Sequence, residues 1–176
     1  HARVENCEFQ GNVHPDTDAI DYDDVEDGVI KNCNIHGFFG TNSDGIDIGE
    51  NAVNISIDSL IIYNITDKGI SVGQRSTAII RNCTFLNCNL GLGLKDSCKV
   101  TLDHCTFYGT STPVACFEKN PGSAGGNAFV KNCILSNSYD NSFLVDERSA
   151  LDISYSLTDN DFLPENGTNI FGNPAF

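Results

Sequence analysis

The chain has 176 residues, a formal net charge of −14 and only ten Lys and Arg residues. This length fits one domain, and the charge argues against nucleic acids and anionic membranes, which both require a basic surface. No apolar run approaches the roughly 18 residues of a membrane-spanning helix, so membrane insertion is not expected. The acidity favours cations and neutral sugars as partners, or anionic sugars approached through a bound metal ion.

A short phrase recurs from the first residues onward, in which Asn-Cys is followed by an apolar residue two positions after the cysteine. Clear copies, one of them with His in place of Asn, cover residues 4–9, 30–35, 80–85, 102–107 and 130–135. Ser59 and Tyr155 are expected to fill the cysteine position in two degenerate copies, so that this position recurs every 22 to 28 residues. Periods of this length indicate stacked repeats.

Each period also carries a second short apolar segment. These segments are residues 20–22, 46–48, 70–72, 92–94, 115–117 and 143–145. A unit of two short strands without helical periodicity cannot bury its apolar face alone, but stacked copies can. The sequence therefore predicts an all-β fold, a parallel β-helix of about seven coils in which each strand pairs with its copy in the next coil.

The repeat also predicts which residues face inward and which form the turns. One inward column is expected to contain Phe9, Ile35, Ile61, Phe85, Phe107, Leu135 and Leu157. The turn position before the cysteine is held by Asn6, Asn32, Asn82 and Asn132, with Asp58, His104 and Ser154 as substitutes. Asparagine suits this place because it tolerates left-handed backbone angles and can stack its amide on the next coil.

We expect a single domain over residues 1–176, with an irregular C-terminal segment at 158–176. The chain starts inside the repeat, at His1, so it is expected to be a piece of a longer chain. Open coil ends present unpaired strand edges, which would permit end-to-end self-association.

Five of the eight cysteines occupy one repeated inward position, which favours buried free thiols over a disulfide framework. No pairing is assigned to Cys88, Cys98 and Cys116, which fall at different phases of the repeat. Sequons at Asn54, Asn64, Asn82 and Asn166 permit N-glycosylation. Together with the acidic, Met-free and Trp-free composition, they favour an extracellular or cell-surface location.

Acidic residues are unevenly placed, with seven between residues 16 and 27, then Asp44 and Asp47 one coil later and Asp67 in the coil after that. Aligning the second strands places Asp18 over Asp44 with Asp67 nearby, and places Asp21 over Asp47. Stacked carboxylates repel one another, so a raised pKa, a cation or a nearby base such as Lys68 must compensate.

Three interpretations of these acids remain open. A shared proton would suit general acid and base chemistry on a glycosidic bond. A cation would be Ca²⁺, held by Asp18, Asp21, Asp44 and Asp47. The third interpretation is a solvated acidic face that keeps a solenoid soluble.

The Asn-Cys-Thr-Phe type of repeat, followed by a Gly-Ile-x-Ile strand, resembles the right-handed parallel β-helix repeat of the pectate-lyase-like superfamily over roughly residues 3–157. The resemblance implies a right-handed solenoid. It leaves function open, because that superfamily includes lyases, glycoside hydrolases, epimerases, adhesins and repeat proteins without known catalysis.

Residues 41–48, Thr-Asn-Ser-Asp-Gly-Ile-Asp-Ile, are similar to the Asn-Thr-Asp-Gly-Ile-Asp motif of polygalacturonase-type glycoside hydrolases. That resemblance implies a catalytic role for Asp44. The family's Asp-Asp pair, one coil on, is replaced by Asp67-Lys68, and its Gly-His-Gly and Arg-Ile-Lys motifs have no counterpart. Lyase or epimerase chemistry needs a base and a cation, for which Lys68, Arg75 and Lys95 are available on consecutive coils.

The sequence thus predicts an extracellular, carbohydrate-associated β-helix domain that binds or processes a polysaccharide through an acidic, cation-binding face. As an enzyme it would be a lyase, an epimerase or a glycoside hydrolase. In that case Asp44 would act as acid or base, Asp18 and Asp67 as its partners, and Lys68 as the charge-stabilising group. The alternative is a non-catalytic structural rod, adhesin or filament segment.

Overall fold

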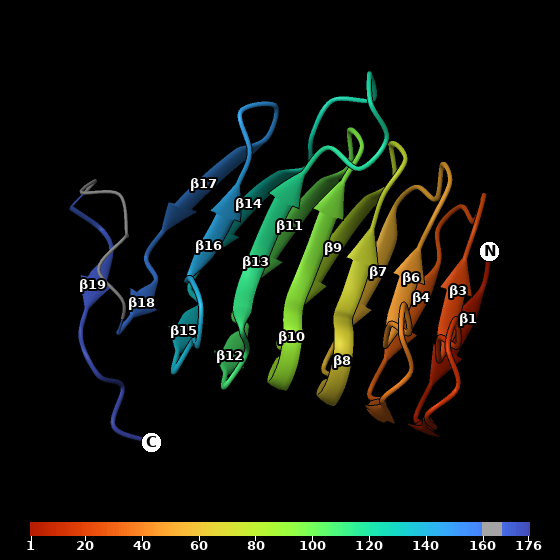
Figure 1. Cartoon of the computed structure of the whole chain (residues 1–176), viewed down its shortest axis with the longest axis horizontal. Coiled ribbons are helices and arrows are strands. Elements are labelled where there is room, and N and C mark those ends of the chain that lie inside the picture. Colours follow the sequence, from red (N-terminus) through yellow and green to blue (C-terminus); the bar gives the residue numbers. More distant parts are fainter. Residues whose placement is uncertain (160–166) are drawn as a thin grey trace.

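The computed structural model describes residues 1–159 and 167–176. In the described residues every regular element is a β-strand, and the strands wind into a solenoid with the first and last coils at opposite ends (Figure 1). No helix in this part of the chain is long or apolar enough to cross a membrane. The prediction of an all-β parallel solenoid of about seven coils is therefore confirmed.

One wall of the solenoid is a seven-stranded parallel sheet with one strand from each coil. Its strands are β1 (Arg3–Glu5), β4 (Val29–Lys31), β7 (Ile55–Asp58), β9 (Thr77–Arg81), β11 (Lys99–Asp103), β14 (Asn127–Lys131) and β17 (Ala150–Ser154). Its inward column joins Val4, Ile30, Ile57, Ile80, Leu102, Val130 and Ile153 in strict register.

The remaining strands make the other two walls, which are continuous through the two long strands β8 (Ile61–Val72) and β10 (Thr84–Lys95). The first halves of these strands pair within the series β2 (Glu8–Gln10), β5 (Asn34–Phe38), β12 (Thr106–Tyr108), β15 (Ile134–Ser136), β18 (Leu157–Thr158) and β19 (Ile170–Phe171). Their second halves belong to a second series, in which β3 (Ile20–Tyr22) pairs with β6 (Ile46–Ile48), β6 with β8, β10 with β13 (Thr112–Phe117), and β13 with β16 (Phe143–Val145). Because β19 pairs with β18, part of the segment expected to be irregular adds one more strand.

The predicted register is wrong by one residue in two coils. The inward column contains Ile62 and Thr158 rather than Ile61 and Leu157. Backbone bonds align Leu60 with Cys33 and Cys83, so Leu60, and not Ser59, occupies the cysteine position. A separate one-residue error affects the second apolar segment, whose fifth copy is Val114–Cys116 rather than residues 115–117, because Val114 pairs with Leu92 and with Phe143.

The backbone φ angle of the turn residue explains the errors at Ile61 and Leu157. Asn32 has φ 52° and Ser59 has φ 61°, so Ser59 takes the asparagine turn position instead of Asp58. In the last repeat Tyr155, with φ 51°, takes that position instead of Ser154, and Ser156 follows in the cysteine position. His104, with φ 56°, is a turn residue as predicted. The register of each coil is therefore fixed by the turn residue with a positive φ, and not by the residues that look most like the Asn-Cys pair.

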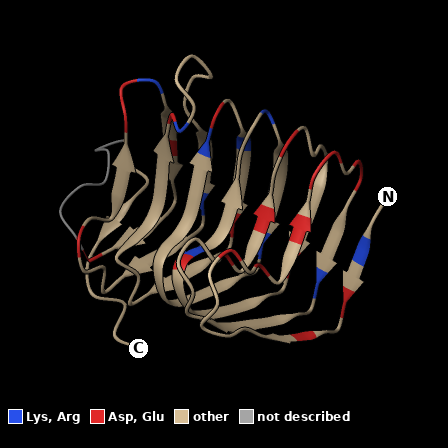
Figure 2. Ribbon diagram, turned by 45° about the vertical axis from the view of Figure 1, so that its right-hand side comes forward, with Lys and Arg blue, Asp and Glu red and all other residues tan. Residues whose placement is uncertain are grey.

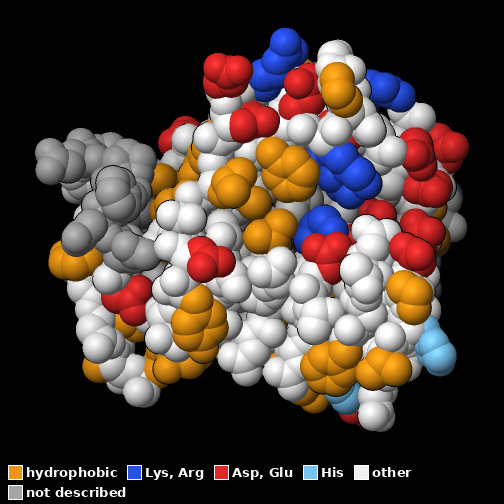
Figure 3. Space-filling view, in the orientation of Figure 1, with side chains coloured by type: hydrophobic (Ala, Val, Ile, Leu, Met, Phe, Trp, Pro, Cys, Tyr) orange, Lys and Arg blue, Asp and Glu red, His pale blue; other side chains and the backbone are white. Residues whose placement is uncertain are grey.

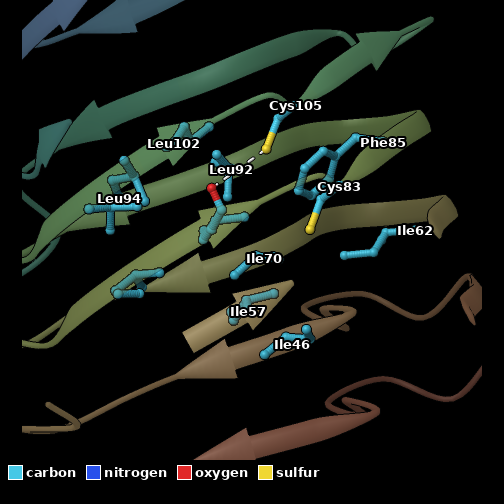
Figure 4. Packing of buried hydrophobic residues seen from close by; sticks show 14 of the residues in the cluster. Ile46, Ile57, Ile62, Ile70, Cys83, Phe85, Leu92, Leu94, Leu102 and Cys105 are labelled. Carbon is cyan, nitrogen blue, oxygen red and sulfur yellow. Dashed lines mark hydrogen bonds between the residues drawn. The ribbon is translucent and has the colours of Figure 1, made fainter. Parts of the chain in front are cut away.

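The core is one continuous apolar column filled from all walls, and Figure 4 shows Leu102, Leu92 and Phe85 meeting in the interior. The rings of Phe85 and Phe107 stack one coil apart, with centroids 4.5 Å apart and planes at 4°. All eight cysteines are free thiols and seven of them are buried, while Cys7 in the first coil is exposed. The prediction of buried free thiols is thus confirmed for the inner coils.

Glycines make the bend between the two halves of β8 and β10 possible. A Cβ atom on Gly69 would lie 2.8 Å from the Gly91 carbonyl oxygen and 2.9 Å from the Phe85 ring. A Cβ on Gly91 would meet Phe107 and the Pro113 carbonyl oxygen equally closely. Only glycine fits where the walls meet at this corner. The residue before each of Gly45 and Gly69 is Asp44 or Lys68, and the bend places both at the outer corner.

Candidate functional site

Asp18, Asp44 and Lys68 occupy the same corner position in three consecutive coils. The backbone N–H of Asp44 donates to Asp18 Oδ1 at 2.6 Å, and the backbone N–H of Lys68 donates to Asp44 Oδ1 at 3.0 Å. Each carboxylate therefore satisfies the backbone of the next coil, which fixes the height and direction of both acids. The structure brings together Asp18 and Asp44, as the alignment of the repeats predicts.

Lys68 joins two carboxylates above this pair. Its Nζ lies 3.1 Å from Asp44 Oδ1 and 2.6 Å from Asp67 Oδ2. Asp44 is 5% exposed and Lys68 is 9% exposed, so the pair is almost fully removed from water. Burying charges is unfavourable unless they are paired and hydrogen-bonded, and both conditions hold here.

The pKa values of Asp44 and Lys68 are both raised, but for different reasons. Burial raises the pKa of Asp44 to about 6, even though the Lys68 ammonium opposes the rise. Burial alone would lower the pKa of Lys68, but Asp44 and Asp67 outweigh it and hold that pKa above its usual value. Burial also raises the pKa of Asp18, against the Asp44 N–H bond. Lys68 therefore stays charged, and Asp44 is the group that gains or loses a proton near neutral pH.

The other two predicted acids lie one column away on the outer face. Strand pairing places Asp21 beside Asp47 and Asp47 beside Ser71, and Figure 2 shows acidic residues on neighbouring strands near the N-terminal end. Burial, then Asp23 and Asp47, raise the pKa of Asp21. Among the described residues no three His, Cys, Asp or Glu side chains are arranged to hold a metal ion. Calcium at Asp18, Asp21, Asp44 and Asp47 stays a prediction.

A hollow of about 500 Å³ flanks Asp67. It is lined by Phe39, Gly40, Thr41, Asn42, Thr66 and Asp67. Phe39 is 52% exposed, whereas its neighbour Phe38 is buried. Phe39 is not among the site residues predicted from the sequence, although two adjacent phenylalanines at a strand end imply that one points outward. Asp67 therefore connects the hollow, with its exposed aromatic ring, to the network of Lys68 and Asp44.

Lys95 and Ser71 are two further polar residues on this face, and both are buried. Burial lowers the pKa of Lys95, against the attraction of Asp47. Figure 3 shows basic side chains next to acidic ones near the middle of this face, with hydrophobic side chains beside them. Arg75, the third basic residue considered from the sequence, instead donates to Asn51 Oδ1 and is exposed. Counting repeats could not separate Lys95 from Arg75, because burial depends on the residues of neighbouring coils.

The arrangement differs from a pair of acids that act on opposite sides of a water molecule. One coil above Asp44 stands Lys68, which is bonded to Asp44, so this position supplies a cation instead of a second carboxylate. The network can hold a proton on Asp44 and place a fixed positive charge beside it.

A family model described as a right-handed beta helix region matches residues 1–162. No curated protein and no solved structure matches the chain. The family match covers all the coils that form the site described above.

Proposed function

Because the chain belongs to the family of right-handed β-helix proteins, we propose that it is an extracellular domain that binds or processes a polysaccharide through the outer face of β3, β6, β8 and β10. The observation that carries this proposal is the buried Asp44–Lys68–Asp67 network, whose Asp67 lines the same hollow as Phe39. Buried charges with shifted pKa values are concentrated at functional sites. A hollow of this size suits a small ligand or a few sugar units.

The side chains have complementary roles in this proposal. Phe39 offers an exposed ring against which the apolar face of a sugar can pack. Asp44, with a pKa raised to about 6, is the acid or base. Lys68 stabilises negative charge, and Asp67 orients Lys68 through the 2.6 Å contact. Asp18 is the partner that holds the backbone of Asp44.

A lyase, an epimerase and a glycoside hydrolase would use this set differently. Inverting hydrolysis needs a second carboxylate to activate water, and Lys68 stands where the similar hydrolases have one. Proton abstraction beside a carbonyl group needs one base and one fixed cation. The pair of Asp44 and Lys68 supplies that combination, which favours lyase or epimerase chemistry if the domain is catalytic.

The extracellular location is supported by the sequons. Asn54 and Asn82 are exposed, and each donates its side-chain amide to an aspartate of the preceding coil. Asn64 is half-buried. Asn166 lies outside the described residues.

The proposal is tested by binding. Purified protein is titrated by calorimetry with neutral polysaccharides (β-glucan, galactan, xylan) and with polyuronates (polygalacturonate, alginate), each with and without Ca²⁺, and products are assayed as reducing ends and as unsaturated uronates. We expect at least one polysaccharide to bind, and D44N and F39A to weaken that binding at least tenfold. D58N, on the outer edge of β7 in the opposite wall, is the matched control and should bind as wild type does.

The alternative is a structural rod that associates end to end through its open coils. A wild-type protein that binds none of these polysaccharides, and that forms longer particles with concentration in sedimentation, would replace the binding proposal with the rod. A rise in melting temperature with Ca²⁺ but not with Mg²⁺ would support the proposed calcium site. An unchanged melting temperature would remove calcium from the proposal.

A further inference from the structure

Lys95, at the end of β10, is a buried lysine without an ionic partner. It is 5% exposed, and among the described residues no carboxylate oxygen lies within 4.0 Å of its Nζ. The other buried lysine among the described residues is Lys68, and it is paired with two carboxylates. Lys95 is therefore a cation that lies against the outer face of the sheet, with an ammonium group that has no ionic partner among the described residues.

Two glycines let the lysine stems lie flat on this sheet. A Cβ atom on Gly73 would lie 3.1 Å from Lys95 Cε, and a Cβ on Gly93 would lie 2.4 Å from Lys68 Cδ. Gly93 pairs with Ser71, and Gly73 follows Ser71 by two residues. The two stems therefore flank Ser71 from neighbouring coils, which explains why this outward-facing serine has no exposed surface.

Two polar atoms at this place have no partner. Within the described residues neither Ser71 Oγ nor Asp47 Oδ1 makes a hydrogen bond, although both atoms are buried. Ser71 and Asp47 are strand partners, so the two atoms belong to the same small area. Buried polar groups are normally satisfied, and an unsatisfied pair beside an unpaired lysine indicates a place where a ligand completes the hydrogen bonds.

The three groups define the chemistry of that ligand. Asp47 accepts a hydrogen bond, Lys95 donates, and Ser71 can do either. A ligand must therefore offer donors and acceptors within a few ångströms, as neighbouring hydroxyl groups on a sugar ring do. A carboxylate, sulfate or phosphate offers only acceptors and would face Asp47 together with the acids around Lys68.

We propose that Lys95, Ser71 and Asp47, here named the diol cluster, bind a vicinal pair of hydroxyl groups of a neutral sugar unit. The inference rests on the proposed polysaccharide function and narrows it to the binding of neutral sugars, which lack the carboxyl group that lyase or epimerase chemistry at Asp44 would require. The flexible Lys95 side chain swings off Gly73 when the ligand arrives, and its ammonium and Ser71 Oγ donate to one sugar oxygen while the neighbouring hydroxyl donates to Asp47. Burial lowers the pKa of Lys95, against the attraction of Asp47, as expected for an ammonium that is removed from water without a carboxylate in contact.

The test uses the full chain and the same neutral and uronate polysaccharides. The variants are S71A, K95M and D47N. K99M is the matched control, because Lys99 is exposed on β11 in the opposite wall. S71A removes only an unbonded hydroxyl, so it should fold as wild type does and serves as the variant for which misfolding is not an explanation. Circular dichroism and thermal unfolding check the other two.

We expect a neutral polysaccharide to bind at least tenfold more tightly than either uronate. S71A should weaken that binding about threefold and K95M and D47N at least tenfold, while K99M leaves it unchanged. Tighter binding of a uronate than of every neutral polysaccharide would overturn the diol cluster and leave the proposed function standing. The same holds if neutral binding is lost in D44N but kept in S71A, K95M and D47N. If no polysaccharide binds, both proposals fall.

Discussion

Two columns of charged side chains run along the solenoid on opposite walls. On the outer edge of the seven-stranded sheet, strand pairing joins Glu5, Lys31, Asp58, Arg81, Asp103 and Lys131, so the sign of the charge changes with every coil. We name this set the alternating column. On the other wall Asp18, Asp44 and Asp67 gather around Lys68, with Asp21 and Asp47 beside them. We name this second set the acidic cluster.

The two sets show what stacking in register does to charges. Each residue of a coil has a neighbour of fixed identity about 4.8 Å above and below it, so like charges at one position repel through the whole stack. The alternating column avoids this, with Lys31 and Lys131 each 3.6 Å from an aspartate of the next or preceding coil. The acidic cluster accepts like charges and compensates with one lysine and backbone N–H groups.

The pKa shifts of the two sets have opposite signs. The pKa values of Asp58 and Asp103 are lowered, first by hydrogen bonds from the amides of Asn82 and Asn132, and then by the Ser59 hydroxyl and Lys31 for Asp58 and by Lys131 and His104 for Asp103. Those of Asp44 and Asp18 are raised, first by burial. The alternating column therefore stabilises the fold, whereas the acidic cluster reduces stability at neutral pH. An alternation of charge would have avoided this loss of stability. Proteins accept such losses mainly at functional sites, so the acidic cluster is a candidate for one.

The largest effect is expected when the acidic cluster loses its cation. In K68M, Asp44 stays buried without a positive neighbour, and we expect the free energy of unfolding to fall by about 3 kcal/mol at pH 8. At pH 5 the loss should shrink to about 1 kcal/mol, because Asp44 is then protonated. Urea unfolding at the two pH values measures both.

The matched change in the alternating column is K31M. Lys31 has a side chain that is 43% exposed, and its removal should change the free energy of unfolding by less than about 1 kcal/mol. If K68M were as stable as K31M at pH 8, the Asp44–Lys68 pair would not be the buried ion pair on which the proposed site depends.

The second effect is a pH dependence of opposite sign in the two sets. The folded-state pKa of Asp44, about 6, lies above the usual 3.8, so the folded protein binds the extra proton between these values. Stability therefore falls as pH rises from about 4 to about 6, by about 3 kcal/mol for this group. D44N lacks the group, so its stability relative to wild type should rise by that amount across the window. Denaturant unfolding at closely spaced pH values measures the difference.

D103N is the control for this experiment. The folded-state pKa of Asp103 is lowered, so its contribution is present above the usual value and lost as pH falls below about 4. The stability of D103N relative to wild type should then be flat between pH 5 and pH 8 and improve only in acid. A flat profile for D44N as well would mean that Asp44 titrates as an ordinary exposed carboxylate.

Much of this fold can be read from the sequence, because stacked repeats turn spacing into contact. Phe85 and Phe107, 22 residues apart, stack as the repeat predicts. The error at Ile61 arose because Leu60 takes the place of a cysteine and the preceding turn residue is a serine with φ 61°. In most coils an asparagine marks the turn, but the turn is defined by a positive φ. Where another residue type adopts that φ, as Ser59 does, the sequence does not show the position of the turn.

The site is less accessible to the same reasoning. Asp18 and Asp44 follow from aligning the coils, and Lys68 follows from the replaced acid in the third coil. Phe39 lies in a connection after β5, where the repeat gives no register. The burial of Lys95 depends on Gly73 in the preceding coil. The presence of a glycine in one repeat does not by itself predict that a lysine of the next repeat lies over it.

The smallest effect is expected from removing the alternation itself. R81E places a third acid between Asp58 and Asp103, which are its partners in the preceding and following coils. Since all three side chains have access to water, we expect the free energy of unfolding to fall by only about 1 kcal/mol at low salt. The loss should nearly disappear at 1 M salt, where the Debye length is only about 3 Å and exposed charges farther apart than that are largely screened. R81Q removes the cation without adding an acid and should have at most half the effect. Equal effects of R81E and R81Q at low salt would show that alternation contributes nothing, and that the contrast between the two walls rests on burial alone.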